Sequence, residues 1–215
     1  MGGNFVVALI EGQNGYIWAG TNNGLSKFDG LKWESIPGVK KAVTSLWSDE
    51  NGLWVGTPDG LWQLGQDSLI KQSLAGLRIS CIKRIDGQLV VGTNAGLFQH
   101  NGSKWEAITT ARGRRPDIWD ISQDSLGHIW VASLGQGLFS WEGQKLVPIR
   151  EPGAPSRFTT SVLIGPDHRL WVGTQDQGIF LRNPSDSTWT KLGQRQGLPA
   201  NYVHSMTMDA WGQIW

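Results

Sequence analysis

Five copies of one short motif run through this chain of 215 residues and set its fold class. The motif is an aromatic or apolar residue, a second apolar residue, Gly-Thr or a close variant, and then Gly-Leu or Gly-Ile. Its copies begin at Trp18, Trp54, Val90, Trp130 and Trp171, and a sixth begins at Trp215. Successive starts are 36, 36, 40, 41 and 44 residues apart. A period of this size is typical of a β-propeller, in which each repeat forms one four-stranded blade.

Each repeat divides into four short segments of β-strand type. First strands are predicted at residues 43–47, 79–82, 118–121, 161–164 and 203–208, several of them followed by a turn that starts with Asp and ends with Gly. A Trp-Val-Gly-Thr strand, a hairpin that ends in Gly-Leu and a fourth strand complete the unit. Fourth strands are predicted at residues 32–36, 104–108 and 188–192, and the glycines are interpreted as turn glycines. No segment has the apolar period of a helix, so the predicted fold class is all-β, a β-propeller of four-stranded antiparallel blades.

The repeat also predicts the domain organisation. A single propeller domain spans residues 1–215, with blades at about 4–37, 42–72, 78–110, 117–150 and 159–193 and the start of a sixth at 201–215. Residues 4–18 align without a gap with residues 201–215, so the two ends duplicate each other. We therefore expect five complete blades from a larger propeller; the alternative is a closed ring with a redundant hairpin. The interfaces between neighbouring blades are expected to hold Trp18, Trp54, Trp130 and Trp171.

Composition and charge exclude several classes of function. Nineteen basic residues stand against 18 acidic ones, and a net charge of +1 gives no indication of a nucleic-acid partner. The single cysteine excludes a disulfide scaffold, and no apolar run is long enough to span a bilayer. The four histidines have neither the spacing of a metal site nor that of a His–carboxylate pair. We therefore expect no catalytic residue, no metal ion and no cofactor.

Two segments resemble a known family. Val43 to Leu61 and Gly197 to Val203 are similar to the two-component regulator propeller repeat, the second to its Gly-Leu-Pro-x-Asn-x-Val segment. Local departures are Val90 in place of the aromatic residue, Ala132-Ser133 in place of Gly-Thr, and a short turn at Asp86-Gly87. The resemblance covers essentially the whole chain, because the turn, strand and loop signatures recur together in order.

The resemblance implies a function as well as a fold. In that family, repeats form large periplasmic propellers, commonly of seven blades, that precede a transmembrane helix and a cytoplasmic histidine kinase or diguanylate cyclase. The implied role is a non-catalytic sensor segment that binds an oligosaccharide or other small molecule, in a membrane-anchored receptor that forms a homodimer. The first residues do not have the pattern of a signal peptide, so we expect the signal peptide to lie outside this chain.

Charge location indicates where a ligand binds. In a propeller, the linkers between blades share one rim with the hairpins between second and third strands, while the turns between first and second strands form the opposite rim. Basic residues gather in the linkers and acidic ones in the opposite turns. Arginine suits carboxylate or sulfate recognition, and an adjacent aromatic ring can stack on a sugar. The predicted ligand-binding residues are Arg112, Arg114, Arg115, Trp119, Arg157 and Arg195.

Other interpretations stay open at this stage. The acidic turns can be purely structural, and the basic loop residues can be merely solvated. In place of a sensor, the chain can be a propeller scaffold for protein–protein interaction. A third alternative is a lyase similar to the streptogramin lyases, which requires a His–carboxylate pair over the central funnel; the repeat alignment has no such pair.

Overall fold

The computed structural model describes residues 5–12, 15–37, 39–65 and 69–215. These residues form strands β1 to β20 and one turn of 3₁₀ helix, η1 (Gln194–Gln196), which confirms the all-β prediction. The chain forms two compact units, Met1–Asn94 and Ala95–Trp215, and the division between them falls in the turn between β10 and β11. The blade boundaries given above stay a prediction.

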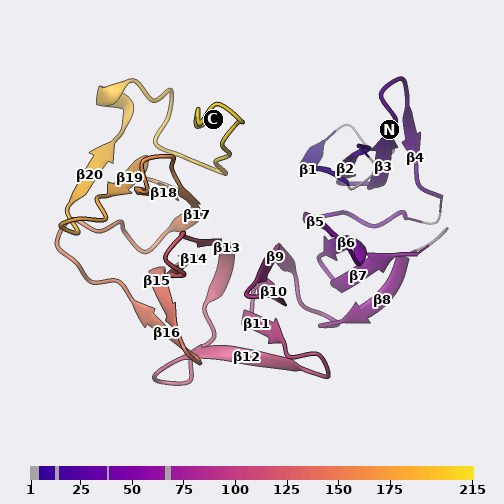
Figure 1. Cartoon of the computed structure of the whole chain (residues 1–215), viewed down its shortest axis with the longest axis horizontal. Coiled ribbons are helices and arrows are strands. Elements are labelled where there is room, and N and C mark those ends of the chain that lie inside the picture. Colours follow the sequence, from indigo (N-terminus) through magenta and orange to yellow (C-terminus); the bar gives the residue numbers. More distant parts are fainter. Residues whose placement is uncertain (1–4, 13–14, 38, 66–68) are drawn as a thin grey trace. The chain divides into compact units, whose positions relative to one another are not determined.

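The first unit contains two four-stranded antiparallel sheets and one hairpin (Figure 1). One sheet is β1 (Val6–Glu11), β2 (Ile17–Thr21), β3 (Gly24–Phe28) and β4 (Trp33–Ser35). The next is β5 (Ser45–Asp49), β6 (Gly52–Thr57), β7 (Gly60–Leu64) and β8 (Leu69–Ser73). The hairpin is β9 (Ile79–Ile85) and β10 (Gln88–Thr93). In both sheets the strand order is the sequence order, as expected for a meander.

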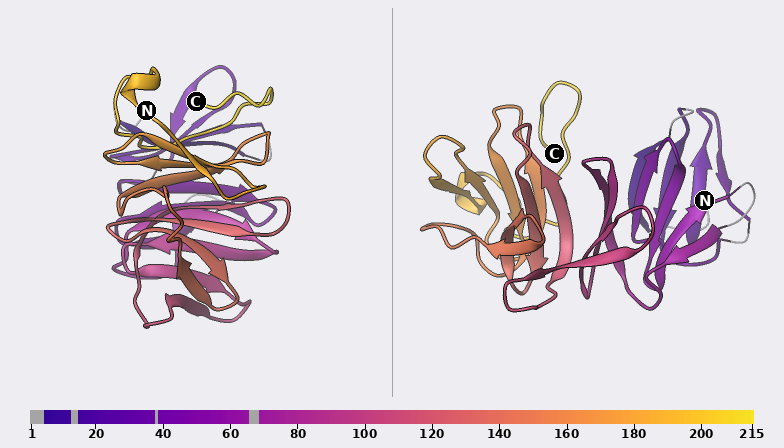
Figure 2. Two further views of the ribbon diagram at one scale, coloured as in Figure 1. Left: turned by 90° about the vertical axis from the view of Figure 1, so that its left-hand side faces the viewer. Right: turned by 60° about the horizontal axis from the view of Figure 1, so that its bottom comes forward.

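The second unit repeats this pattern. It contains the antiparallel pair β11 (Gly96–His100) and β12 (Trp105–Thr110). One sheet follows as β13 (Asp117–Gln123), β14 (Ile129–Leu134), β15 (Gly137–Glu142) and β16 (Lys145–Pro148). The last is β17 (Thr159–Ile164), β18 (Leu170–Thr174), β19 (Ile179–Arg182) and β20 (Trp189–Leu192). Figure 2 shows these twisted sheets from two further directions. Strand β12 also pairs in parallel with β16, a link between outer strands that the meander pattern did not predict.

The prediction of a strand at residues 203–208 is wrong. There, Thr207 and Trp215 exchange two backbone hydrogen bonds, and Met208 forms an isolated bridge with Ile214. Upstream, the N–H of Val203 donates to the carbonyl of Thr174 at 2.9 Å, and its carbonyl accepts from Thr160 Oγ1 at 2.5 Å. Equivalent bonds, from Val43 to Thr21 and from Thr44 to Ile79, lie at or just before the start of first strands that do pair with their second strand. Among the described residues, 203–208 pair with the segment after them only through Ile214 and Trp215.

Glycine in the Trp-Val-Gly-Thr strand lets neighbouring sheets approach closely. A Cβ added to Gly56 would lie 2.1 Å from Ser45 Oγ and 2.9 Å from Ile79 Cβ, the latter on the first strand of the next repeat. The same close approach joins Gly20 to Val43 and Gly173 to Val203. The interpretation of the glycines as turn glycines is therefore wrong for these three, because each lies within or at the end of a strand and is needed for packing between sheets.

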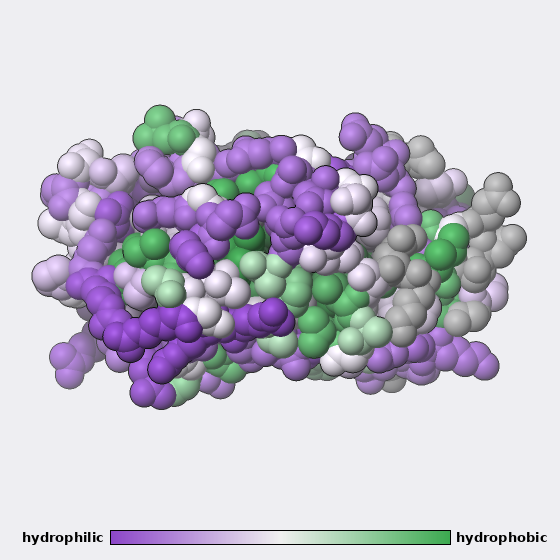
Figure 3. Space-filling model, turned by 90° about the horizontal axis from the view of Figure 1, so that it is seen from below, coloured by the Kyte–Doolittle hydropathy of each residue, from purple (hydrophilic) through white to green (hydrophobic). Residues whose placement is uncertain are grey.

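Tryptophan fills the adjacent space. Trp130 belongs to a buried cluster that joins β14 and β15 to β17, β18 and β19, and its side chain is buried. Trp18 packs against a second cluster, which includes Val43 and Val55 of the following repeat. The predicted role at interfaces between blades is confirmed for these two residues. The face seen in Figure 3 is mainly hydrophilic, and its apolar side chains lie in separate groups.

The threonine of the motif closes the next hairpin. Thr57 Oγ1 donates to the carbonyl of Gly60 at 3.0 Å and accepts hydrogen bonds from Asp59 N at 3.2 Å and Trp62 Nε1 at 3.2 Å. The hydroxyls of Thr21 and Thr174 donate to the equivalent carbonyls. Ser133 stands at this position in the fourth repeat, and its buried Oγ has no hydrogen-bond partner among the residues that the structure describes. Serine and threonine at the same motif position therefore differ in hydrogen bonding: the threonine hydroxyls bond to the hairpin, whereas the Ser133 hydroxyl has no such bond among the described residues.

This contrast gives a matched pair of substitutions. Thr57→Val keeps the side-chain shape but removes the three hydrogen bonds of the hydroxyl, so the free energy of unfolding is expected to fall by about 1–2 kcal/mol. Ser133→Ala removes a hydroxyl that bonds nothing described, and a change within about 0.5 kcal/mol is expected. Urea denaturation followed by tryptophan fluorescence measures both. Equal losses in the two variants would contradict the assigned hydrogen-bond role.

Candidate ligand site

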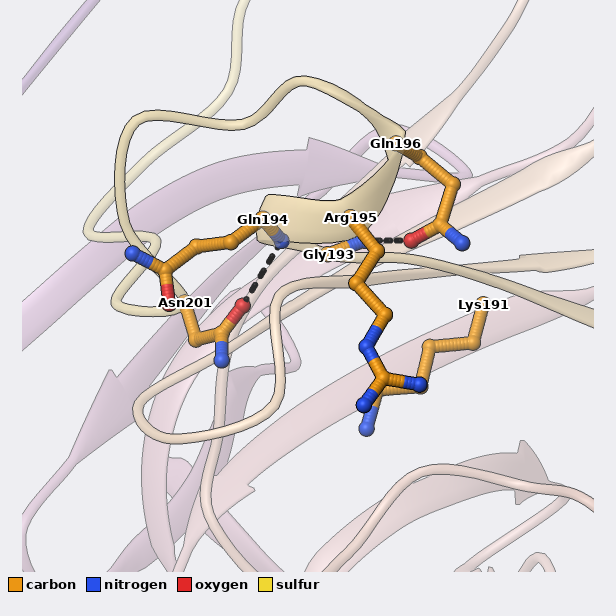
Figure 4. A pocket seen from close by; sticks show the side chains of 6 residues that line it. All are labelled: Lys191, Gly193, Gln194, Arg195, Gln196 and Asn201. Carbon is orange, nitrogen blue, oxygen red and sulfur yellow. Dashed lines mark hydrogen bonds between the residues drawn. The ribbon is translucent and has the colours of Figure 1, made fainter.

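A polar pocket of about 390 Å³ lies in the second unit, directly after β20 (Figure 4). Its lining residues come from the end of β20, from η1 and from the segment that follows: Lys191, Gly193, Gln194, Arg195, Gln196 and Asn201. The volume falls within the range of roughly 300–1,000 Å³ that is typical of small-molecule sites. Because none of the lining side chains is apolar, the pocket suits a hydrophilic ligand better than an apolar one.

The Gly-Leu-Pro-x-Asn segment contributes Asn201 to this pocket, and the hydrogen bonds of Asn201 hold the lining residues in place. Asn201 Oδ1 accepts the N–H of Gln194 at 3.1 Å, and the Asn201 carbonyl accepts the N–H of Gly178 at 2.8 Å. Gln196 Oε1 accepts the N–H of Gly193 at 2.9 Å. The chain then turns at Gly197, whose φ of 102° lies in the left-handed region that favours glycine. Asn201 thus joins the end of the linker to η1 through its side chain, and to the hairpin between β18 and β19 through its carbonyl.

The pocket holds two basic side chains, Lys191 and Arg195. Both residues are exposed, and their side chains extend to the same side of η1 in Figure 4. Lys191 Nζ lies 5.6 Å from the ring centroid of Phe180. No carboxylate among residues 5–12, 15–37, 39–65 and 69–215 forms an ion pair with either cation. The site is therefore locally positive although the whole chain is nearly neutral.

Only one of the six predicted ligand residues, Arg195, lines this pocket. Arg112 and Arg114 are exposed in the turn between β12 and β13, where Arg114 exchanges hydrogen bonds with Thr110 through its N–H and carbonyl. Trp119 lies on β13, and its ring contacts that of His204 edge-on at 6.3 Å. The proposed ligand role of these residues stays a prediction.

The other two predicted residues lie against aromatic rings. The side chain of Arg115 packs over Gly96, and its guanidinium lies 5.8 Å from the ring centroid of Phe98. The guanidinium of Arg157 lies 5.7 Å from the ring centroid of Phe158. A cation also covers Trp62 (Lys41, 4.6 Å) and Phe180 (Lys191). The residue after Gly-Leu or Gly-Ile is aromatic in four repeats, as Trp62, Phe98, Phe139 and Phe180. An aromatic residue at this position, beside which a cation can lie, was the signal that could have pointed to Lys191. The sequence analysis did not predict Lys191 as a ligand residue.

The shared rim is built as expected within each unit. Gly135, in the hairpin between β14 and β15, donates its N–H to the carbonyl of Arg157 in the following linker at 2.8 Å. In the first unit, a Cβ on Gly24 would lie 2.2 Å from the carbonyl oxygen of Val39. Linkers between repeats therefore lie against the hairpins between second and third strands.

The acidic turns have a structural role. Asp124 Oδ1 accepts the N–H groups of Leu126 and His128, and Asp209 Oδ1 accepts those of Trp211 and Gln213. The hydrogen bond from Trp215 Nε1 is the main cause that lowers the pKa of Asp209. Partial burial raises the pKa of Asp124, but hydrogen bonds from His128 outweigh it, so the pKa is lowered. These carboxylates are committed to hydrogen bonds with backbone N–H groups.

One expectation about histidine is wrong. His128 Nδ1 lies 2.9 Å from Asp124 Oδ2, so a His–carboxylate pair with i,i+4 spacing is present. The pair arises because the Asp turn brings residue i+4 back over the carboxylate. It lies in the turn between β13 and β14, the His128 side chain is 63% exposed, and neither residue lines the pocket described above.

A cluster around the ion pair of Glu151 and Arg182 lies elsewhere in the second unit. Glu151, in the linker before β17, accepts Arg182 Nε at 2.8 Å and Nη2 at 2.7 Å, and also Trp189 Nε1 at 2.7 Å. The guanidinium of Arg182 lies 5.2 Å from the ring of Trp130. Hydrogen bonds from Arg182 lower the pKa of Glu151 despite its partial burial, and those bonds raise the pKa of Arg182. This cluster neutralises its own charge and therefore fastens the linker rather than attracting a ligand.

The described residues contain no group of three or more His, Cys, Asp or Glu side chains that could hold a metal ion. Within the same part of the chain, no helix is long and apolar enough to cross a membrane.

Comparison with known proteins agrees with the repeat. The sequence model of the family described as "Two component regulator propeller" matches residues 1–23. Residues 1–23 are thus similar to a two component regulator propeller repeat. No curated protein matches the sequence.

Solved structures that resemble the chain indicate its fold class. The extracellular domain of the hybrid two component system BT3049 from B. thetaiotaomicron matches with a TM-score of 0.82 and 21% identity, over 100% of this chain and 32% of that one. That of BT4673 from the same organism matches with a TM-score of 0.66 and 18% identity, over 98% and 36%. Virginiamycin B lyase from Staphylococcus aureus matches with a TM-score of 0.75 and 13% identity, over 98% and 76%. The fold is that of a β-propeller, and the chain spans about a third of the length of the two-component ectodomains.

Proposed function

We propose that this chain is a ligand-sensing segment of a two-component signalling receptor, that it binds a saccharide, and that it has no catalytic activity of its own. The observation that carries the proposal is the likeness of the whole chain to the extracellular domain of a hybrid two-component system, at a TM-score of 0.82. The segment then lies on the periplasmic side of a bacterial inner membrane, in a membrane-anchored receptor that acts as a homodimer.

Two features of the described residues support this role. The pocket after β20 is polar, as a saccharide requires, and its residues lie on the rim where linkers and hairpins meet. The turn carboxylates, such as Asp124 and Asp209, are bonded to backbone N–H groups and so are poorly placed for acid–base chemistry. A polar pocket with no described carboxylate available for proton transfer supports a binding role without catalysis.

Calorimetric titration of the chain with a panel of neutral and acidic oligosaccharides tests the proposal, with chromatography of each ligand afterwards. Binding of at least one saccharide, recovered unchanged, is the expected result. Cleavage of a bound saccharide would contradict the absence of catalysis, and failure of the whole panel to bind would contradict the saccharide role.

A scaffold for protein–protein interaction is the second candidate. Apolar side chains of the first repeat are exposed, with Phe5 at 67% and Leu9 at 63%. Capture of a protein partner that a Leu9→Ser variant no longer binds, together with no response to saccharides, would favour this candidate over the sensor.

A further inference from the structure

We infer that the pocket after β20 binds the anionic group of its ligand, a carboxylate or sulfate on a small hydrophilic molecule. The inference rests on the proposed function only in taking the pocket as a ligand site, and it adds the chemical class and the residues. Lys191 and Arg195 are the groups that we assign to the anion.

The first argument is charge. Three arginines elsewhere in the chain form ion pairs with carboxylates: Arg84 with Asp49 at 2.5 Å, Arg182 with Glu151 at 2.7 Å and Arg169 with Asp167 at 3.3 Å. Within the described part of the chain, no carboxylate neutralises Lys191 or Arg195. Two uncompensated cations that share one concave site favour a negatively charged occupant.

The second argument is the orientation of the side-chain amides. Asn201 Oδ1 and Gln196 Oε1 are both occupied by backbone N–H groups, as the dashed lines in Figure 4 mark. Each amide therefore has its NH₂ group left as a donor. Gln194 is the exception, because its Nε2 donates to the carbonyl of Pro199 and leaves Oε1 as an acceptor.

Together these groups make a site that mainly donates hydrogen bonds. Lysine offers three N–H donors and arginine five, and the amides of Asn201 and Gln196 add two each. A ligand with several acceptor oxygens and a negative charge matches this set. Carboxylate and sulfate oxygens also fit the planar fork of arginine, which forms paired hydrogen bonds to them.

Two exposed basic residues beside β16 provide a matched comparison. Lys145 and Arg150 are likewise without a described ion pair, but they adjoin the turns on either side of β16 and do not line the pocket. The double variant Lys191→Gln/Arg195→Gln removes two charges from the pocket, while the turn variant, Lys145→Gln/Arg150→Gln, removes two charges beside these turns. Both changes affect exposed side chains, so both proteins are expected to fold.

The test titrates the chain with glucuronate and glucose, which share a ring and differ by a carboxylate, and with glucose 6-sulfate and inorganic sulfate. Two-dimensional ¹H–¹⁵N NMR measures binding. Glucuronate or glucose 6-sulfate is expected to bind more tightly than glucose, and more weakly at higher salt because salt screens the exposed charges. The pocket variant is expected to lose at least about tenfold in affinity, and the turn variant less than about twofold.

The outcomes separate this inference from the proposed function. Equal binding of glucose and glucuronate would overturn the anionic class while leaving a saccharide sensor in place. Loss of glucuronate binding in the turn variant alone would overturn the assignment to Lys191 and Arg195. Inorganic sulfate binding without any binding of the two anionic sugars would show an adventitious ion only. Binding of none of the four probes would overturn the inference, whereas the saccharide panel decides the sensor role separately.

Discussion

Replacing Gly56 by alanine is expected to lower the free energy of unfolding by about 3 kcal/mol, the upper part of the usual range for overpacking. The added Cβ would lie 2.1 Å from Ser45 Oγ and 2.8 Å from Ile79 Cγ2. Ser45 can rotate its hydroxyl away, but Ile79 is fully buried and its Cβ would be only 2.9 Å distant. Strand β9 must therefore move away from β6, and the packing between these repeats is lost with it.

The fourth repeat supplies the control for this substitution. Ala132 is buried at the equivalent position, so the packing there already accommodates a methyl group. Ala132→Gly is expected to cost only about 1 kcal/mol, because glycine is more flexible in the unfolded chain and the methyl contact is lost. Urea denaturation of both variants measures the difference. If Gly56→Ala is no more destabilising than Ala132→Gly, the glycine is not required for close approach of the strands.

The same residues show how much of the fold the sequence could predict. The phase of the repeat placed the second strands well because Trp, Gly and Thr recur together. The sequence did not show why each of these residue types is required at its position. Gly56 looked like a turn glycine, since the neighbour that excludes a side chain, Ile79, belongs to the next repeat. Contacts between repeats depend on how sheets stack, and a pattern within one repeat carries no information about that.

The candidate site shows a similar limit. Position along the chain predicted basic residues in the linkers, and Arg195, which lines the pocket, was among the predicted residues. Which cation lines a pocket, however, depends on how the chain packs around it, and the repeat pattern does not give that. Arg115, Arg157 and Lys191 each lie against an aromatic ring, yet of these three Lys191, on a strand rather than in a linker, lines the pocket.

Glu151→Gln is expected to lower the free energy of unfolding by about 2 kcal/mol at neutral pH. The carboxylate forms charge-assisted hydrogen bonds with both Arg182 and Trp189, and such bonds contribute roughly 1.5–3 kcal/mol. Side chains of the ion pair are only 28% and 16% exposed, so solvent replaces the lost partner incompletely. Removing the charge also loosens Arg182 from the ring of Trp130, which joins two sheets.

The pH dependence of this loss identifies its cause. Because the folded-state pKa of Glu151 is lowered from 4.5, its ion pair contributes fully above the unfolded-state pKa and is lost as pH falls through the folded-state value. The stability difference between the native chain and Glu151→Gln is therefore expected to be constant from pH 7 to about 5 and to shrink at more acidic pH. Urea denaturation at a series of pH values measures it.

Glu142→Gln is the matched control for that series. Glu142 is an exposed carboxylate at the end of β15, and its described bond is from the hydroxyl of Ser140. An exposed group of this kind is expected to change stability by less than about 0.5 kcal/mol at any pH. A difference for Glu151→Gln that stays the same down to acid pH would mean that the substitution acts through side-chain packing. The ion pair with Arg182 would then not be what fastens the linker to β19.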